Sequence, residues 1–198
     1  LKRSVLLVGF DAEEKGLLGS KYFVEKPTLA LTQIKTMINM DMIGRVKDSV
    51  VNIGGVGTSP VFRPLLDSLK FMHPLKLTLS DAGLGPSDHA SFYTNEIPVL
   101  FFFSGFHDEY HTPEDTWKKI NLRGEKDILD LVYDIVYNLS RLKNAPSFSA
   151  TSPMKTQSSM ATSFKVTMGI MPSYNSSKEG LEIDAISRAD GPAAKAGI

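Results

Sequence analysis

Short apolar runs recur along the first two thirds of the chain. Residues 4–10, 36–42 and 98–104 are almost continuously apolar, a pattern typical of buried strands in a sheet that is covered on both faces. The stretches 50–53 and 75–79 are shorter and also have the character of strands. The pattern therefore predicts a sheet whose central strands are buried.

Segments with helical spacing separate these strands. In residues 125–143 the apolar side chains repeat on one stripe and the acidic side chains lie off it, which predicts a helix packed on the sheet. Residues 59–72 have similar spacing, with Ser59 as the expected N-cap and Pro60 at the first helical position. Alternating strands and helices predict an α/β fold, a three-layer sandwich around a mixed, mostly parallel sheet. Two shorter helices are predicted at residues 16–24 and 88–93.

The pattern changes after residue 145. Residues 146–163 are rich in Ser, Thr and Pro and have no periodicity, which is typical of a linker. Strand-like segments follow at 164–170 and 180–186, and residues 193–196 favour a short helix. We therefore expect a first domain at 1–145, a linker at 146–163 and the beginning of a small β-rich domain at 164–198.

Composition narrows the chemistry. Lys plus Arg and Asp plus Glu both number 22, so no basic excess favours nucleic acid or an anionic membrane. The apolar runs are too short to span a membrane. The chain contains no Cys, which excludes disulfides, a Cys nucleophile and thiolate ligands. Any metal must therefore be bound by His and carboxylate groups.

Two loops carry candidate chemistry. Glu13 and Glu14 follow the first apolar run, and His111 lies in a His-rich acidic loop after the run at 98–104. Of two adjacent carboxylates, one can bind a metal while the other takes a proton from metal-bound water. Asp41 lies within an apolar run, where a carboxylate is costly unless it is paired or metal-bound. The alternatives are an exposed acidic turn at Glu13–Glu14 and a turn-capping role for Asp41.

Three further polar residues lie near the same segments. Asp88 and His89 precede a short predicted helix, where they could support a metal ligand by hydrogen bonding or could cap their own helix. His107 lies four positions before His111 and is a further candidate for a supporting or substrate-pocket role. Apolar residues near Phe102–Phe106 are candidates for the wall of a side-chain pocket, together with Phe92.

Four segments together resemble the C-terminal half of the co-catalytic zinc aminopeptidases, the family of leucyl aminopeptidases and glutamate carboxypeptidase. They occur in the family's order and are quite specific: AEEKGLLGS at 12–20, NMDMIGR at 39–45, GPSDHASF at 85–92 and HDEYHTPEDT at 107–116. The resemblance covers residues 1 to about 145. It implies an α/β sandwich fold and hydrolysis of the N-terminal residues of peptides.

The resemblance also implies roles for individual residues. Glu13 corresponds to the general base, and Glu14, Asp41 and His111 correspond to zinc ligands. Tyr110 corresponds to the residue that stabilises the oxyanion. An intact domain of this family holds two zinc ions with five ligands, and the remaining His and bridging Asp have no counterpart here. We therefore expect that residues 1–198 alone are inactive and that the N-terminal half lies upstream.

Residues from 164 onward resemble the start of a bacterial PDZ domain, through MGIMP at 168–172, GLEI at 180–183 and GPAAKAG at 191–197. Such domains bind peptide C-termini by adding a strand to a sheet edge. The alternative is a generic β-hairpin extension. The family also implies a periplasmic or secreted location, although no signal is visible in these residues. Two other functions stay open: a glutaminyl cyclase-like zinc enzyme, or a non-catalytic scaffold that binds peptides through the PDZ-like segment.

Overall fold

The molecule is described here by a computed structural model that covers residues 1–151, 168–172, 183–186 and 191–197. Four strands form one sheet in the order β1-β4-β2-β3. Strand β1 is parallel to β4, and β2 is parallel to β3, while β2 and β4 are antiparallel. The expected mixed, mostly parallel sheet is confirmed. The strands are β1 (Met37–Asp41), β2 (Val50–Gly54), β3 (Lys76–Leu79) and β4 (Val99–Phe103).

Strand β4 is the centre of the fold because it lies between β1 and β2. Consecutive side chains on a strand point to opposite faces, and in β4 both faces are buried. Leu100 and Phe102 belong to the cluster on one face, and Val99 belongs to the cluster on the other. This two-sided burial explains why the sequence of β4 is apolar without alternation.

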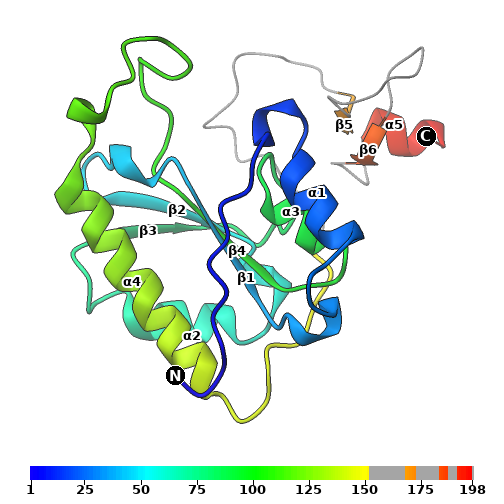
Figure 1. Ribbon diagram of the computed structural model, residues 1–198, viewed down its shortest axis with the longest axis horizontal. Coiled ribbons are helices and arrows are strands. Elements are labelled where there is room, and N and C mark those ends of the chain that lie inside the picture. The colour runs from blue at the N-terminus through cyan, green and yellow to red at the C-terminus, as the bar shows by residue number, and fades with distance from the viewer. Residues whose placement is uncertain (152–167, 173–182, 187–190, 198) are drawn as a thin grey trace.

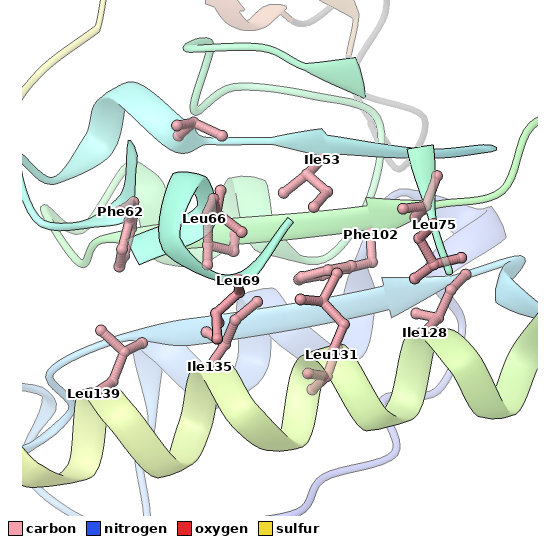
Figure 2. Close-up of a cluster of buried hydrophobic side chains, with 14 of the residues drawn as sticks. Ile53, Phe62, Leu66, Leu69, Leu75, Phe102, Ile128, Leu131, Ile135 and Leu139 are labelled. Atoms are coloured by element: carbon pink, nitrogen blue, oxygen red, sulfur yellow. The ribbon is translucent and has the colours of Figure 1, made fainter. Parts of the chain in front are cut away.

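The larger cluster lies between the sheet and two helices, α2 (Phe62–Leu69) and α4 (Leu122–Arg141). Figure 2 shows the α4 side chains pointing toward Phe102 and Ile53 of the sheet. The side chain of Asn121 accepts a hydrogen bond from Gly124 N at 3.0 Å and so caps α4. The predicted apolar stripe of α4 is confirmed by its fully or almost fully buried members, which are Ile128, Leu131, Val132, Ile135 and Leu139.

Helices α1 (Leu18–Glu25) and α3 (His89–Tyr93) cover the opposite face (Figure 1). A smaller cluster forms there around Phe92 and Val99, with Phe10 and Phe23 packed against it. Helices on both faces complete the expected three-layer sandwich. The short 3-10 helices are η1 (Glu13–Lys15), η2 (Leu31–Gln33), η3 (Ile43–Arg45), η4 (Val56–Thr58) and η5 (Trp117–Lys119).

The prediction of a buried strand at residues 4–10 is wrong. The segment is neither strand nor helix and runs as a long trace across the molecule (Figure 1), and Leu7 is 87% exposed. An apolar run becomes a strand only where a neighbouring strand supplies hydrogen bonds. None of the four strands of the described sheet pairs with this run. Instead, Arg3 donates to the carbonyls of Leu139 and Ser140, which holds the start of the chain against the end of α4.

The predicted N-cap of α2 is also wrong. The helix begins at Phe62, and Val61 occupies the N-cap position without a side-chain hydrogen bond. Ser59 is buried, and its hydroxyl has no partner among the described residues. The backbone of Ser59 is extended, with φ −153°, so the chain makes a turn at 60–61 before the helix starts.

Residues 146–151 lie against η4 and α3. Ser149 N donates to Thr58 O, and Thr151 N donates to the hydroxyl of Tyr93 at 3.0 Å. Gly83 N donates to the hydroxyl of Thr151. This stretch, the first six residues of the expected linker, is therefore anchored next to α3.

Three elements are described beyond residue 167. Strands β5 (Ile170–Pro172) and β6 (Ile183–Ile186) form an antiparallel pair, and α5 (Pro192–Ala196) ends at Gly197. The strand expected at 180–186 is confirmed over its last four residues. Of the strand expected at 164–170, residues 164–167 lie outside the described residues.

Candidate metal and catalytic site

Glu13 and Glu14 lie in a tight turn that packs against the start of α1. The turn is η1, and it is closed by left-handed backbone at Ala12 (φ 54°) and Gly16 (φ 98°). Gly19 N donates to Asp11 O at 3.0 Å. A Cβ atom at position 19 would lie only 2.6 Å from that oxygen, so the close approach requires glycine. The two adjacent carboxylates can therefore point to one site, since they are not on a strand.

Asp41 is the last residue of β1 and pairs in register with Phe103, the last residue of β4. Since the two strands are parallel, the loop after β4 leaves the sheet at the same edge as Asp41. Asp41 accepts a hydrogen bond from the hydroxyl of Ser87 at 2.9 Å. That hydroxyl accepts one from Asn39 Nδ2 at 2.8 Å.

His111 lies in the loop after β4 and contacts Glu14 directly. Its Nε2 atom is 2.8 Å from Oε1 of Glu14. Both side chains are more than half exposed, 55% for His111 and 66% for Glu14. His111 adopts φ 58°, a conformation that is uncommon for residues other than glycine. The structure thus joins the two loops that the sequence singles out.

Glu13 lies among other acidic groups. Its partial burial raises its pKa to about 7, and the nearby carboxylates of Asp41, Glu14 and Asp88 contribute to the rise, while His111 opposes it. A carboxyl group with a pKa near 7 can both accept and return a proton at neutral pH. This environment is typical of a general base rather than of a solvated acidic turn.

Tyr110 directly precedes His111 and is 37% exposed. Its pKa is raised by partial burial and by the charges of Glu14, Asp41 and Glu13. As in an ordinary tyrosine, the hydroxyl is protonated at neutral pH and can donate a hydrogen bond to a developing negative charge. The ring lies edge-on to Phe106, with the centroids 5.1 Å apart.

Asp88 is buried at the start of α3, where one of its oxygens, Oδ1, has no partner among the described residues. Burial raises its pKa, a hydrogen bond with Ser20 opposes the rise, and the charge of Asp41 adds to it. It occupies the N-cap position of α3 without making a side-chain capping bond. The helix-cap interpretation of Asp88 is therefore wrong, and its neighbour Ser87 supports Asp41 instead.

His89 is 1% exposed and stacks on Phe101 at 4.3 Å between ring centroids. Burial lowers its pKa to about 3, so it is neutral. Its Nδ1 atom is 3.5 Å from Asn39 Nδ2. His89 is thus the inner end of a chain of polar contacts that runs through Asn39 and Ser87 to Asp41.

Of the side chains proposed for a substrate pocket, two are in the cores. Phe92 and Phe102 are both buried in the hydrophobic clusters. Phe106 is 63% exposed, beside Tyr110. Only Phe106 is therefore both exposed and in contact with a site residue among these three.

The donor atoms fit zinc in kind. Imidazole nitrogen and carboxylate oxygen are ordinary zinc ligands, and Glu14 and His111 already lie within contact of each other. The number of ligands is too small for a complete site. In the described ranges, no three His, Asp or Glu side chains come close enough together to bind one metal ion. A zinc site built on these residues needs at least one more donor.

The site is open to solvent. A hollow of about 570 Å³ lies elsewhere, beside η4 and α2, and is lined by residues such as Ser59, Arg63 and Asp81. None of the candidate site residues lines it.

In the described part of the chain, no helix is both long and apolar enough to cross a membrane.

Sequence reasoning missed Arg45, Glu109 and Asp115. Arg45 Nη1 donates to Asp115 Oδ1 at 2.7 Å, and Arg45 Nη2 donates to Glu109 Oε2 at 2.5 Å. His107, which was a candidate, lies against the same two carboxylates. The local signal was two pairs of acidic residues followed by two lysines in the 107–119 segment, which does not identify Arg45 as the partner.

Comparison with known proteins places this geometry in a wider context. The chain is 26% identical over 155 residues to aminopeptidase YwaD of Bacillus subtilis, covering 73% of this chain and 34% of that protein. It is also similar to the structure of BSAP, a zinc aminopeptidase from Bacillus subtilis, with a TM-score of 0.57 and 26% identity over 71% of this chain and 37% of BSAP. The chain thus spans about a third of the length of these relatives.

A likeness of fold alone extends to a glutaminyl cyclase from Bacteroides thetaiotaomicron. That structure has a TM-score of 0.51 and 20% identity, over 67% of this chain and 49% of the cyclase.

The family model described as Peptidase family M28 matches residues 1–136, more than two thirds of the chain. With the α/β sandwich and the paired loops, this match shows that the chain belongs to peptidase family M28.

Proposed function

We propose that this chain is part of a zinc-dependent aminopeptidase that removes N-terminal residues from peptides. The observation that carries the proposal is the contact between Glu14 and His111, which joins two loops beside a carboxyl group with a raised pKa. Membership of peptidase family M28 supports peptide hydrolysis. The likeness to a zinc aminopeptidase supports the metal.

Glu14, His111 and Asp41 are the residues that would hold zinc. Bound zinc supplies a Lewis acid that makes water more acidic and polarises the peptide carbonyl. We expect two zinc ions in the intact catalytic domain. The hydrogen bond from Ser87 orients the Asp41 carboxylate, as an outer partner of a metal ligand does.

Glu13 is the proposed general base. It takes a proton from the attacking water and returns it to the leaving amine, and a pKa near 7 suits both steps. Tyr110 is the proposed donor to the oxyanion of the tetrahedral intermediate, because a tyrosine hydroxyl is protonated at neutral pH and this one directly precedes His111 in the loop after β4. Asp88, His89 and His107 do not contact the reacting atoms in this scheme and act as support.

The remaining zinc ligands are proposed to lie in a part of the protein outside residues 1–198. Of the three candidate ligands, Glu14 and His111 are in contact, and the described residues hold no group of three or more donors that could bind a metal. The chain covers about a third of the length of its relatives. We therefore propose that this chain alone does not hydrolyse peptides.

We further propose that residues 1–145 form the C-terminal part of the catalytic domain, that 146–163 connect it, and that 164–198 begin a PDZ-like domain. The antiparallel pair β5–β6 and the short helix α5 support the last proposal. Such a domain would bind peptide C-termini. The periplasmic or secreted location stays a prediction that rests on the resemblance.

The experiment measures zinc content and hydrolysis of aminoacyl-p-nitroanilides, for the whole protein and for residues 1–198. We expect about two zinc ions and activity in the whole protein only. Glu13→Gln should abolish turnover while zinc stays bound, whereas Glu25→Gln, an exposed carboxylate at the end of α1, should leave turnover unchanged.

Two outcomes would redirect the assignment. Cyclisation of N-terminal glutamine by the zinc-loaded protein, without peptide hydrolysis, would identify a glutaminyl cyclase. A whole protein that binds no zinc and hydrolyses nothing would leave a peptide-binding scaffold as the better account.

A further inference from the structure

A cluster of charged side chains joins the two segments that carry Asp41 and His111. We call it the Arg45 cluster. Arg45 binds one oxygen each of Glu109 and Asp115, at 2.5 and 2.7 Å. On the other side, Lys119 Nζ binds the second oxygen of Glu109 at 2.7 Å. His107 completes the ring, with Nδ1 3.3 Å from Glu109 and Nε2 3.5 Å from Asp115.

The cluster is more than a single surface ion pair. Isolated exposed pairs contribute little, whereas networks with fixed geometry contribute more. The side chain of Arg45 is only 16% exposed, that of His107 is 12% exposed, and Arg45 bridges two carboxylates from different turns of one loop. The planar guanidinium group fixes the directions of the hydrogen bonds to Glu109 and to Asp115 together, which an ammonium group cannot do.

The position of the cluster connects it to the site. Arg45 ends η3, four residues after Asp41, and Glu109 directly precedes Tyr110 and His111. The segment 107–115 forms a series of turns, in which Tyr110 N donates to His107 O and Thr112 N donates to Glu109 O, both at 3.0 Å. These turns stay within the segment and do not fix where it lies relative to β1.

His111 also needs external support. Its backbone, at φ 58°, is in a sparsely populated region for a non-glycine residue, and such a conformation persists only when the surroundings hold it. Its side chain is 55% exposed, and its close polar contact among the described residues is with Glu14. Contacts that anchor the loop are therefore needed to keep His111 opposite Glu14.

We propose that Arg45 is a positioning residue that holds the 107–115 loop against the end of β1, so that Tyr110 and His111 face Glu13 and Glu14. It contacts no reacting atom and acts through Glu109 and Asp115. This inference rests on the proposed function, and it adds a residue outside the proposed ligands and acid–base groups.

The test compares Arg45→Ala and Arg45→Lys with Arg63→Ala in the 198-residue chain. Arg63 is a matched control, because it pairs with one carboxylate, Asp81, and is 49% exposed, away from the site. The first measurement is the set of NMR chemical shifts of the His111 ring in the metal-free chain. We call these shifts the His111 signature, because they report the contact of the ring with Glu14. The second measurement is made on the whole protein and its variants, and it is their zinc affinity, determined by competition with a chromophoric chelator.

We expect Arg45→Ala to remove the His111 signature and to lower zinc affinity about 10- to 100-fold, as for loss of an outer partner of a metal ligand. Arg45→Lys should recover part of the His111 signature and part of the zinc affinity, because lysine can bind one of the two carboxylates. Arg63→Ala should change neither. In the whole protein, Arg45→Ala should lower kcat and leave KM within about two-fold.

An unchanged His111 signature in Arg45→Ala would overturn the proposal. If Arg45→Ala does not fold, Glu109→Gln, which keeps the shape and removes the charge, takes its place with the same expected loss of the His111 signature. A wild-type whole protein that binds no zinc would overturn the proposed function and not the positioning role, since the metal-free signature is measured independently.

Discussion

Nε2 of His111 lies 2.8 Å from Oε1 of Glu14, although the residues are 97 positions apart. One belongs to a turn before α1 and the other to the loop after β4. Neither helix nor strand geometry links those two places, so their contact depends on the whole sheet. Anything that moves either loop should therefore be detected at this pair.

The raised pKa of Glu13 predicts a specific dependence of stability on pH in the metal-free chain. A carboxyl group with a higher pKa in the folded state binds its proton more tightly there. Its contribution to the free energy of unfolding is complete below about pH 4.5 and is lost as the pH rises through about 7. Between these two pH values, the free energy of unfolding of Glu13→Gln should therefore rise relative to that of the wild type. Above about pH 7, the difference between the two proteins should stay constant.

Urea unfolding from pH 4.5 to 8, with a chelator present, measures this effect. The variant Glu25→Gln should follow the wild-type curve, since Glu25 is exposed. Parallel curves for Glu13→Gln and wild type would mean that Glu13 titrates as an ordinary solvated carboxyl group.

Ser87→Ala tests the polar chain that ends at Asp41. The substitution removes the donor to Asp41 and takes from the buried Asn39 amide its shorter contact, leaving only the 3.5 Å contact with His89. Leaving buried polar groups unpaired costs about 1–3 kcal/mol in the free energy of unfolding. Thermal or urea unfolding measures the loss.

The matched control is Ser68→Ala, because the Ser68 hydroxyl bonds a carbonyl on the exposed side of α2. Its cost should stay within about 0.5 kcal/mol. Equal costs for the two serines would contradict the supporting role of Ser87.

Gly19→Ala should disturb the Glu13–Glu14 turn. The added Cβ atom would lie 2.6 Å from Asp11 O and 2.8 Å from Asp11 N, so backbone must move. Overpacking of this kind costs about 1–3 kcal/mol. Urea unfolding measures the cost, and the NMR signature of the His111 ring should change with it.

Gly9→Ala is the control for that substitution, since a Cβ atom there has nothing within 4 Å. It should leave both measurements unchanged. A Gly19→Ala chain that keeps wild-type stability and an unchanged His111 signature would mean that the turn tolerates a shift.

Tyr93→Phe should release the anchor of residues 146–151. The hydroxyl accepts a hydrogen bond from Thr151 N at 3.0 Å and lies 3.1 Å from the Thr151 hydroxyl. The loss should cost about 1 kcal/mol and should speed amide hydrogen exchange at Thr151. Tyr133→Phe, on an exposed part of α4, should do neither. Unchanged exchange at Thr151 would show that other contacts hold this segment.

The elements predicted best are those whose signal is local. Helix α4 was expected because its apolar stripe repeats from Ile128 to Leu139, and β4 was expected because burial on both faces leaves a continuous apolar run. The family could be recognised because each of the four motifs lies within about ten residues. In these cases the sequence contains nearly all the information that the structure uses.

The wrong or missed predictions concern residues whose structure depends on other residues far away in the sequence. Residues 4–10 have the composition of a buried strand, but a strand also needs a hydrogen-bonded neighbour, and the described sheet offers none. Arg45 and Asp115 are 70 positions apart, and nothing in the local pattern pairs them. The N-cap role of Ser59 failed because the chain makes one more turn before α2 begins.

The apolar run at residues 5–8 has a practical consequence for the isolated chain. Val5, Leu6, Leu7 and Val8 are all between 46% and 87% exposed, in a segment that forms neither helix nor strand (Figure 1). Extended, exposed apolar segments invite pairing with copies of themselves. A preparation of residues 1–198 alone is therefore expected to self-associate as its concentration rises, and dilution or a charged substitution at Leu7 should restore monomers.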